Sequence, residues 1–119
     1  HPTAIETTLD GARKRLGERK LWAIIEPRSN TMRMGSHKDG LAESARIADE
    51  VIWYQPEGLD WDLQPVVDAA PNKAEVARSL DAIINRIVNE AREGDAVVIM
   101  SNGGFGGLHQ KLMAALEAK

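Results

Sequence analysis

Three short runs of almost unbroken apolar residues constrain the fold of this 119-residue chain more than any other feature. They occupy residues 20–26, 50–54 and 96–100, and each is followed by a proline or by a glycine-rich segment. Unbroken hydrophobicity, as opposed to strict alternation, is typical of strands that are buried on both faces of a parallel sheet. The runs therefore predict a parallel sheet that is covered by helices.

The segments around these runs have helical periodicity. Helices are expected over residues 3–16, 38–48, 60–70 and 107–117, and a longer one is expected between Ser79 and Gly94, where apolar residues recur every three to four positions. Residues 73–77 read as an edge-like strand, because charged residues alternate along it. This alternation of helices and strands predicts an α/β fold, a Rossmann-like three-layer α/β/α domain with a mostly parallel sheet, as one domain over residues 1–119.

Composition narrows the class of protein. Hydrophobic residues make up 43% and charged residues 28%, and the net charge of −3 gives no basis for binding nucleic acid or an anionic membrane. The short basic cluster Arg13–Arg15 is interpreted as a solvated helix face. The chain has no cysteine and no apolar run of the roughly 18 to 20 residues that a membrane span needs, so we expect a cytoplasmic protein. It begins at His1 without an initiator Met, which suggests either a piece of a larger protein or a processed chain.

Ligands of open parallel sheets gather at the carboxyl ends of the strands, where residues 27–36, 54–58 and 101–107 are expected to form loops. The last of these, Ser101-Asn-Gly-Gly-Phe-Gly-Gly107, is followed by a helix whose N-terminal N–H groups favour an anion. It matches neither the dinucleotide fingerprint nor the P-loop. The simpler alternative is a tight strand-to-helix turn, although Phe105, placed between glycines, has little local packing to explain it.

The remaining polar residues give a binding surface without a complete catalytic set. Arg28 and Arg33 lie in the first loop, where a guanidinium can bind a carboxylate or a phosphate, or can simply be solvated. His37 and His109 are isolated from other metal-ligating residues, so no metal site is predicted. No Ser-His-Asp, HExxH or CxxC pattern is present, and we assign no catalytic residue.

Three segments together resemble the C-terminal domain of the Mur ligases. His1-Pro-Thr-Ala-Ile5 is similar to the end of the segment that joins the central and C-terminal domains in that family. Ile25-Glu-Pro-Arg-Ser-Asn-Thr-Met-Arg33 resembles its first strand and loop, and Met100-Ser-Asn-Gly-Gly-Phe-Gly-Gly-Leu-His109 its final strand and loop. Within the family, the combination is similar to the branch that joins UDP-N-acetylmuramate to the recycled tripeptide L-alanyl-γ-D-glutamyl-meso-diaminopimelate.

The resemblance implies the C-terminal part of an ATP- and Mg²⁺-dependent ligase that forms an amide bond through an acyl phosphate. ATP and Mg²⁺ would be bound mainly by a central ATP-binding domain, which would be a partner of this domain together with an N-terminal UDP-binding domain. It implies that His1 contacts the nucleotide, and that Arg28, Ser101, Asn102 and Phe105 line the tripeptide. The Asp-Asn-Pro-Arg motif of the diaminopimelate-adding relatives is missing, and Tyr54-Gln-Pro56 stands near its place.

Two other classes of protein share this alternation of helices and strands. A stand-alone Rossmann-like binding or regulatory module, such as a receiver, would need an acidic cluster with a phospho-acceptor aspartate at a strand end, where this chain has Glu26, Tyr54 and Met100. A small Rossmann enzyme would need its glycine-rich loop after the first strand, where this chain has Pro27-Arg28. The stand-alone module without catalysis is the alternative that the sequence leaves open.

Overall fold

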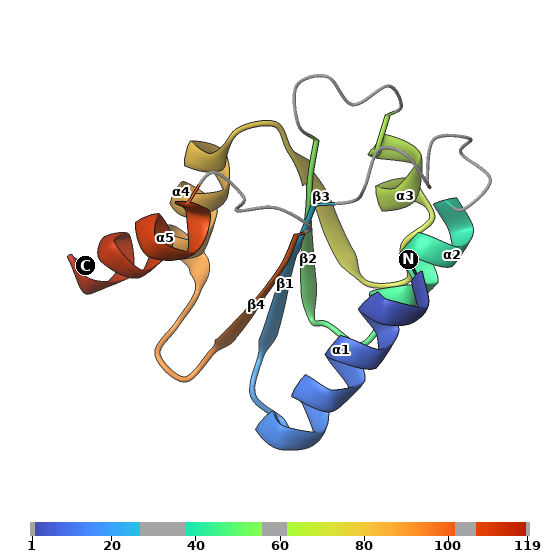
Figure 1. Ribbon diagram of the computed structural model, residues 1–119, viewed down its shortest axis with the longest axis horizontal. Helices are drawn as coiled ribbons and strands as arrows, with labels where there is room; N and C mark the ends of the chain where they lie inside the picture. Colours follow the sequence, from blue (N-terminus) through green and yellow to red (C-terminus); the bar gives the residue numbers. More distant parts are fainter. Residues whose placement is uncertain (1, 27–37, 56–61, 102–106, 119) are drawn as a thin grey trace.

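The computed structural model describes residues 2–26, 38–55, 62–101 and 107–118 of the chain. Four parallel strands form one sheet in the order β3-β2-β1-β4, with helices on either side (Figure 1). The strands are β1 (Leu21–Ile25), β2 (Glu50–Tyr54), β3 (Lys73–Ala77) and β4 (Ala96–Met100). The helices are α1 (Pro2–Leu16), α2 (Lys38–Ser44), α3 (Gln64–Asp68), α4 (Leu80–Glu90) and α5 (Leu108–Glu117).

Strand β1 is the centre of the sheet. Its Ile24 is in register with Ile52 of β2 on one side and with Ile99 of β4 on the other. All five residues of β1 are buried, as expected for a strand that is covered on both faces. The α/β Rossmann-like fold with a parallel sheet, predicted from the unbroken apolar runs, is thereby confirmed.

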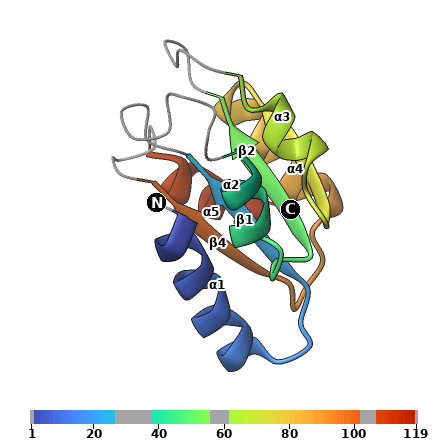
Figure 2. The same cartoon turned by 90° about the vertical axis from the view of Figure 1, so that its right-hand side faces the viewer.

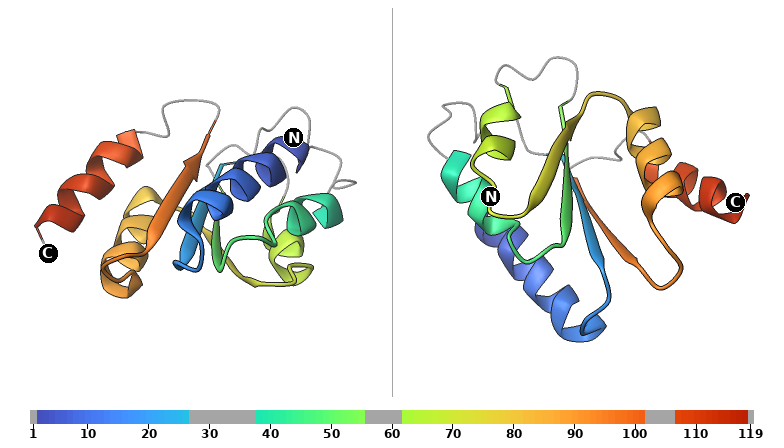
Figure 3. Two further views of the ribbon diagram at one scale, coloured as in Figure 1. Left: turned by 90° about the horizontal axis from the view of Figure 1, so that it is seen from below. Right: turned by 180° about the vertical axis from the view of Figure 1, so that it is seen from behind.

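Two apolar clusters cover the two faces of the sheet. Helices α1, α2 and α3 pack on one face, where Leu9, Leu41 and Trp53 are buried (Figure 2). Helices α4 and α5 pack on the other, where Trp22 and Ile87 are buried (Figure 3). This division follows from right-handed crossovers: the chain steps from β1 to β2 to β3 in one direction and then returns across the sheet to β4.

Helix α4 begins as predicted, whereas α3 covers Gln64–Asp68 and is shorter than the helix predicted over residues 60–70. Ser79 is the N-cap of α4, and its hydroxyl oxygen accepts a hydrogen bond from the Ala82 N–H at 3.1 Å. Pro65 lies in the first turn of α3, where its missing N–H costs nothing.

Helix α2 is shorter than the sequence predicts. It ends at Ser44, and the chain then forms turns up to Ala48. The Asn72 side-chain amide donates to the carbonyl oxygens of Ala45 and Ala48, at 2.9 Å and 2.7 Å. Because this side chain satisfies the carbonyls beyond Ser44, no further helical turn is needed.

The prediction of a solvated basic face is wrong for Arg13. Its guanidinium donates to the carbonyl oxygens of Gly17, Arg19 and Ile47, at 3.0, 2.7 and 3.2 Å, and to the Asp49 carboxylate at 2.9 Å. These acceptors lie after α1 and directly before β2, so Arg13 holds two connections of the fold together.

None of the described helices is both long and apolar enough to cross a bilayer.

Candidate functional site

The direction in which successive strands are added across the sheet reverses between β1 and β4. From β1 the chain proceeds to β2 and then to β3 on one side, whereas β4 pairs with the other side of β1. In open α/β sheets this reversal is where ligands bind. We take the carboxyl ends of β1 and β4 as the candidate site.

Glu26 and Ser101 join the two strand ends at this point. The Glu26 N–H donates to the Met100 carbonyl oxygen at 2.9 Å, which extends the ladder by one residue. The Ser101 hydroxyl then donates to the Glu26 carboxylate at 2.5 Å. Short O–H···O⁻ hydrogen bonds of this kind are charge-assisted and stronger than neutral ones. The main-chain and side-chain bonds together fix where the loops after β1 and β4 begin.

The bond also decides what Ser101 can offer to a ligand. A hydroxyl has one proton, and that of Ser101 is directed to Glu26, so it cannot also be donated to a ligand. The ionised Glu26 carboxylate accepts only, and two oxygens provide about four acceptor positions. Glu26 therefore favours a donor on the ligand.

Gly107 begins the helix on the far side of the glycine-rich loop. It is the N-cap of α5 and has φ 74° and ψ 20°, in the left-handed region that favours glycine. A left-handed residue therefore ends the glycine-rich loop at Gly107. His109, in the first turn of the helix, is exposed.

Gln55 closes the end of β2. Its N–H donates to the Ala77 carbonyl oxygen at 2.8 Å, and its side-chain oxygen accepts from the Leu63 N–H at 2.8 Å. The Gln55 side chain is buried and holds the start of α3 against the sheet. This residue, which stands near the place of the missing Asp-Asn-Pro-Arg motif, thus serves the fold.

Of the residues that the sequence singled out for binding, Ser101 is the one whose position the structure describes. It lies at the carboxyl end of β4, where the sequence placed it. His1, Arg28, Asn102 and Phe105 lie outside the described residues. Sequence reasoning passed over Glu26 as a strand end; its signal is an acidic residue directly after an apolar run and directly before Pro27.

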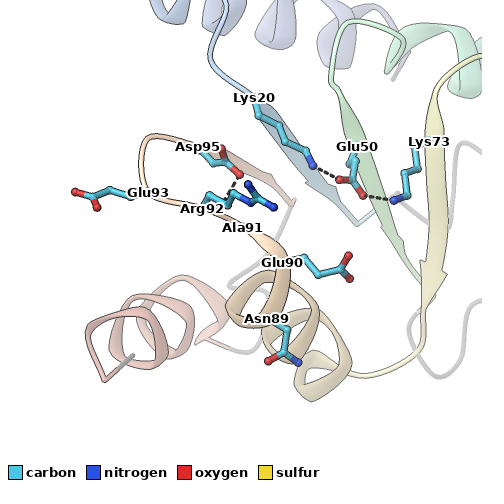
Figure 4. Close-up of a pocket in the computed structure, with 9 residues that line it drawn as sticks. All are labelled: Lys20, Glu50, Lys73, Asn89, Glu90, Ala91, Arg92, Glu93 and Asp95. Carbon is cyan, nitrogen blue, oxygen red and sulfur yellow. Dashed lines mark hydrogen bonds and ion pairs between the residues drawn. The ribbon is translucent and has the colours of Figure 1, made fainter.

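A wide cavity of about 720 Å³ lies at the opposite, amino edge of the sheet (Figure 4). Its walls come from the residues that precede or begin the strands and from the end of α4. They are Lys20, Glu50, Lys73, Asn89, Glu90, Ala91, Arg92, Glu93 and Asp95. Its charge and volume resemble those of a ligand pocket. Whether its charged residues can bind a ligand depends on how they pair with one another.

Glu50 is the buried centre of this amino-edge network, with 5% of its surface exposed. Lys20 forms an ion pair with one carboxylate oxygen, and Arg86 and Lys73 approach the other at 2.8 Å and 3.5 Å. Burial, the largest influence, would raise the pKa of Glu50. The hydrogen bond and charge of Lys20 and the charges of Lys73 and Arg86 outweigh it and hold that pKa below its ordinary value.

The cations of the network are paired as well. Arg86 also contacts Glu75 at 3.0 Å and Glu90 at 2.6 Å, and it lies over the Trp22 ring at 5.3 Å. Three cations therefore face three carboxylates, and the carbonyl end of α4 disfavours an anion there. The network neutralises itself, so we interpret its charges as a contribution to the stability of the fold.

Comparison with known proteins identifies the family of this chain. The family model described as Mur ligase, glutamate ligase domain matches residues 1–103. The UDP-N-acetylmuramate–L-alanyl-γ-D-glutamyl-meso-2,6-diaminoheptandioate ligase of Escherichia coli K12 is 44% identical over 120 residues, which are 100% of this chain and 26% of that protein. The chain thus spans about a quarter of the length of this relative.

Two solved structures are similar to nearly the whole chain. A murein peptide ligase from Psychrobacter arcticus is 57% identical with a TM-score of 0.88, over 98% of this chain and 25% of that one. A domain from a putative UDP-N-acetylmuramate:L-alanyl-γ-D-glutamyl-meso-diaminopimelate ligase of Haemophilus ducreyi is 40% identical with a TM-score of 0.81. The match covers 98% of this chain and 84% of that one.

The parallel sheet and its flanking helices define an α/β domain, in which a ligand is expected at the carboxyl edge of the sheet. The chain belongs to the Mur ligase family, and it corresponds to the C-terminal, glutamate ligase domain of that family.

Proposed function

We propose that this chain is the peptide-binding domain, residues 1–119, of a larger ATP-dependent ligase. The enzyme would join UDP-N-acetylmuramate to L-alanyl-γ-D-glutamyl-meso-diaminopimelate in peptidoglycan recycling, in the cytoplasm where its UDP-linked substrate and ATP are found. The observation that carries the proposal is the 57% identity, over 98% of the chain, to a murein peptide ligase. The position of Glu26 and Ser101 at the reversal of chain direction supports it, because that is where a ligand of this fold is expected.

The binding residues proposed from the sequence belong to this domain's side of a two-sided active site. Arg28 would pair with a carboxylate of the tripeptide, and Ser101, Asn102 and Phe105 would line the peptide. His1 would contact the nucleotide from the segment that leads into the domain. The central ATP-binding and N-terminal UDP-binding domains of the same enzyme would supply the other side and the second substrate.

ATP and Mg²⁺ are assigned to the other domains. Among the residues that the structure describes, no group of three or more His, Asp or Glu side chains is arranged to hold a metal ion. The buried carboxylate at the amino edge, Glu50, is already paired with Lys20, Lys73 and Arg86. The contribution of this chain is therefore to bind and orient the peptide, which lowers the entropic cost of bringing its amine to the reacting carboxyl group.

Activity of the full-length enzyme tests this function. Purified full-length protein with UDP-N-acetylmuramate, the tripeptide, ATP and Mg²⁺ should release phosphate and give a UDP-linked tripeptide of the expected mass. The isolated chain should give neither product. Product from L-alanine in place of the tripeptide, with none from the tripeptide, would contradict the proposed substrate.

A further inference from the structure

Glu26 is a carboxylate at the reversal of chain direction, with acceptor capacity beyond the one bond that fixes it. The Ser101 hydroxyl donates to one oxygen at 2.5 Å, and among the described residues it is the hydrogen-bonding partner of this side chain. By contrast, Glu50 at the other edge has cations on both of its oxygens. Glu26 is partly buried and partly exposed.

The chemistry of this pair selects among ligand groups. A carboxylate or phosphate of a ligand would be repelled by the negative charge of Glu26, and the Ser101 oxygen has no second proton to offer. An ammonium group offers three donors and a positive charge, so it complements the Glu26 carboxylate. The ligand group that meets this point should therefore be an amine.

From this geometry we propose that Glu26, held by Ser101, recognises the free amine at the diaminopimelate end of the tripeptide and so determines specificity. This inference rests on the proposed function, which supplies the peptide. That peptide has two amines, and the alanyl amine has to reach a carboxyl group carried by another domain. The alanyl amine forms the new amide bond, so the distal amine of diaminopimelate is the one that stays positively charged and can pair with Glu26.

A comparison of two peptides in the full-length enzyme tests the assignment. One is the diaminopimelate tripeptide, and the other has 2-aminoheptanedioate at its third position and differs only by lacking the distal amine. Wild-type enzyme should prefer the first in kcat/KM by about tenfold or more, as expected for a charge-assisted hydrogen bond. Glu26→Gln should reduce this preference to about threefold or less, chiefly through KM, while activity on the second peptide persists.

Two further variants separate recognition from folding. Glu26→Asp keeps the charge on a shorter arm and should keep part of the preference, and Ser101→Ala should weaken it less than Glu26→Gln does. Glu93→Gln, an exposed change at the amino edge, is the matched control and should keep the full preference. Thermal unfolding of each variant verifies that the compared enzymes are folded.

The outcomes distinguish this inference from the function on which it rests. Wild-type activity with an unchanged preference in Glu26→Gln, or an equal loss on both peptides, overturns the inference alone, because a purely structural residue would not discriminate between them. Absence of wild-type activity on the tripeptide overturns the proposed function and the inference together.

Discussion

The two edges of the sheet use carboxylates for opposite purposes. At the amino edge, Glu50 is buried and forms ion pairs with three cations, so its negative charge is neutralised within the fold. At the carboxyl edge, Glu26 is partly exposed and is fixed by a neutral hydroxyl, so its charge is retained. A charge with complete internal pairing stabilises a structure, whereas one that is oriented but not neutralised remains available to a ligand.

This contrast makes a testable division. Substitutions at the amino edge should change the free energy of unfolding and leave the KM for the tripeptide unchanged. Substitutions at the carboxyl edge should do the reverse. The unfolding measurements can be made on the isolated chain, because it has its own buried core and a domain of nearly the same extent has been crystallised from a relative.

The largest effect on stability is expected for Glu50→Gln. The change keeps the shape of the side chain but leaves Lys20 and Arg86 in a partly desolvated cluster without their shared carboxylate. Breaking a buried pair costs about 3 kcal/mol or more, and we expect the lower end because Lys20 keeps partial contact with water. Urea unfolding of the isolated domain measures this loss in the free energy of unfolding. The exposed Glu93→Gln is the control and should change stability by less than about 0.5 kcal/mol. Equal unfolding midpoints for both variants would show that the network does not hold the amino edge.

Arg13→Ala should have the next largest effect, a loss of about 2 kcal/mol. It removes hydrogen bonds from a charged donor to three carbonyl oxygens and one carboxylate. Arg15→Ala, two residues further along the same helix, removes an exposed guanidinium and should cost little. A thermal unfolding scan that gives the same midpoint for both variants would support the solvated face that the sequence suggested.

Acid should weaken the amino edge, and the sign follows from the lowered pKa of Glu50. Stability from a carboxylate with a lowered pKa is present above its ordinary value, here 4.5, and is lost as pH falls through the pKa in the folded state. Asp49, whose pKa burial would raise but the Leu21 N–H and Arg13 hold low, contributes with the same sign.

Urea midpoints measured at a series of pH values below neutrality test this dependence. The curve for Glu50→Gln should be shallower than that for wild type below the ordinary pKa, by at most about 1.4 kcal/mol per pH unit for one group. Parallel curves would mean that Glu50 does not titrate differently in the folded and unfolded chain.

The sheet and the longer helices could be predicted from the sequence because each depends on a local pattern. Burial of β1 on both faces follows from five successive apolar residues, and the start of α4 follows from Ser79 before an apolar period. The early end of α2 could not be predicted, since its carbonyls are satisfied by Asn72, which lies far along the chain.

The site could be predicted only in part, because only some of its signals are local in the sequence. Ser101 was found because it opens a glycine-rich loop after a strand, which is a local signal. The partner of its hydroxyl, Glu26, lies 75 residues away, and pairing of β1 with β4 brings the two together. The roles of Glu50 and Arg13 likewise depend on partners in other elements, such as Arg86 of α4, 36 residues from Glu50.

The smallest effect on stability, and the sharpest test of the division, should come from two serine substitutions. Ser79→Ala removes the N-cap hydrogen bond of α4 and should cost about 1 kcal/mol without changing the KM for the tripeptide. Ser101→Ala removes a bond between partly solvated groups and should cost less than about 1 kcal/mol, yet it should raise that KM several-fold by releasing Glu26. Urea unfolding and steady-state kinetics on both variants give the crossed comparison. If KM follows stability in both, orientation of Glu26 is not what Ser101 provides.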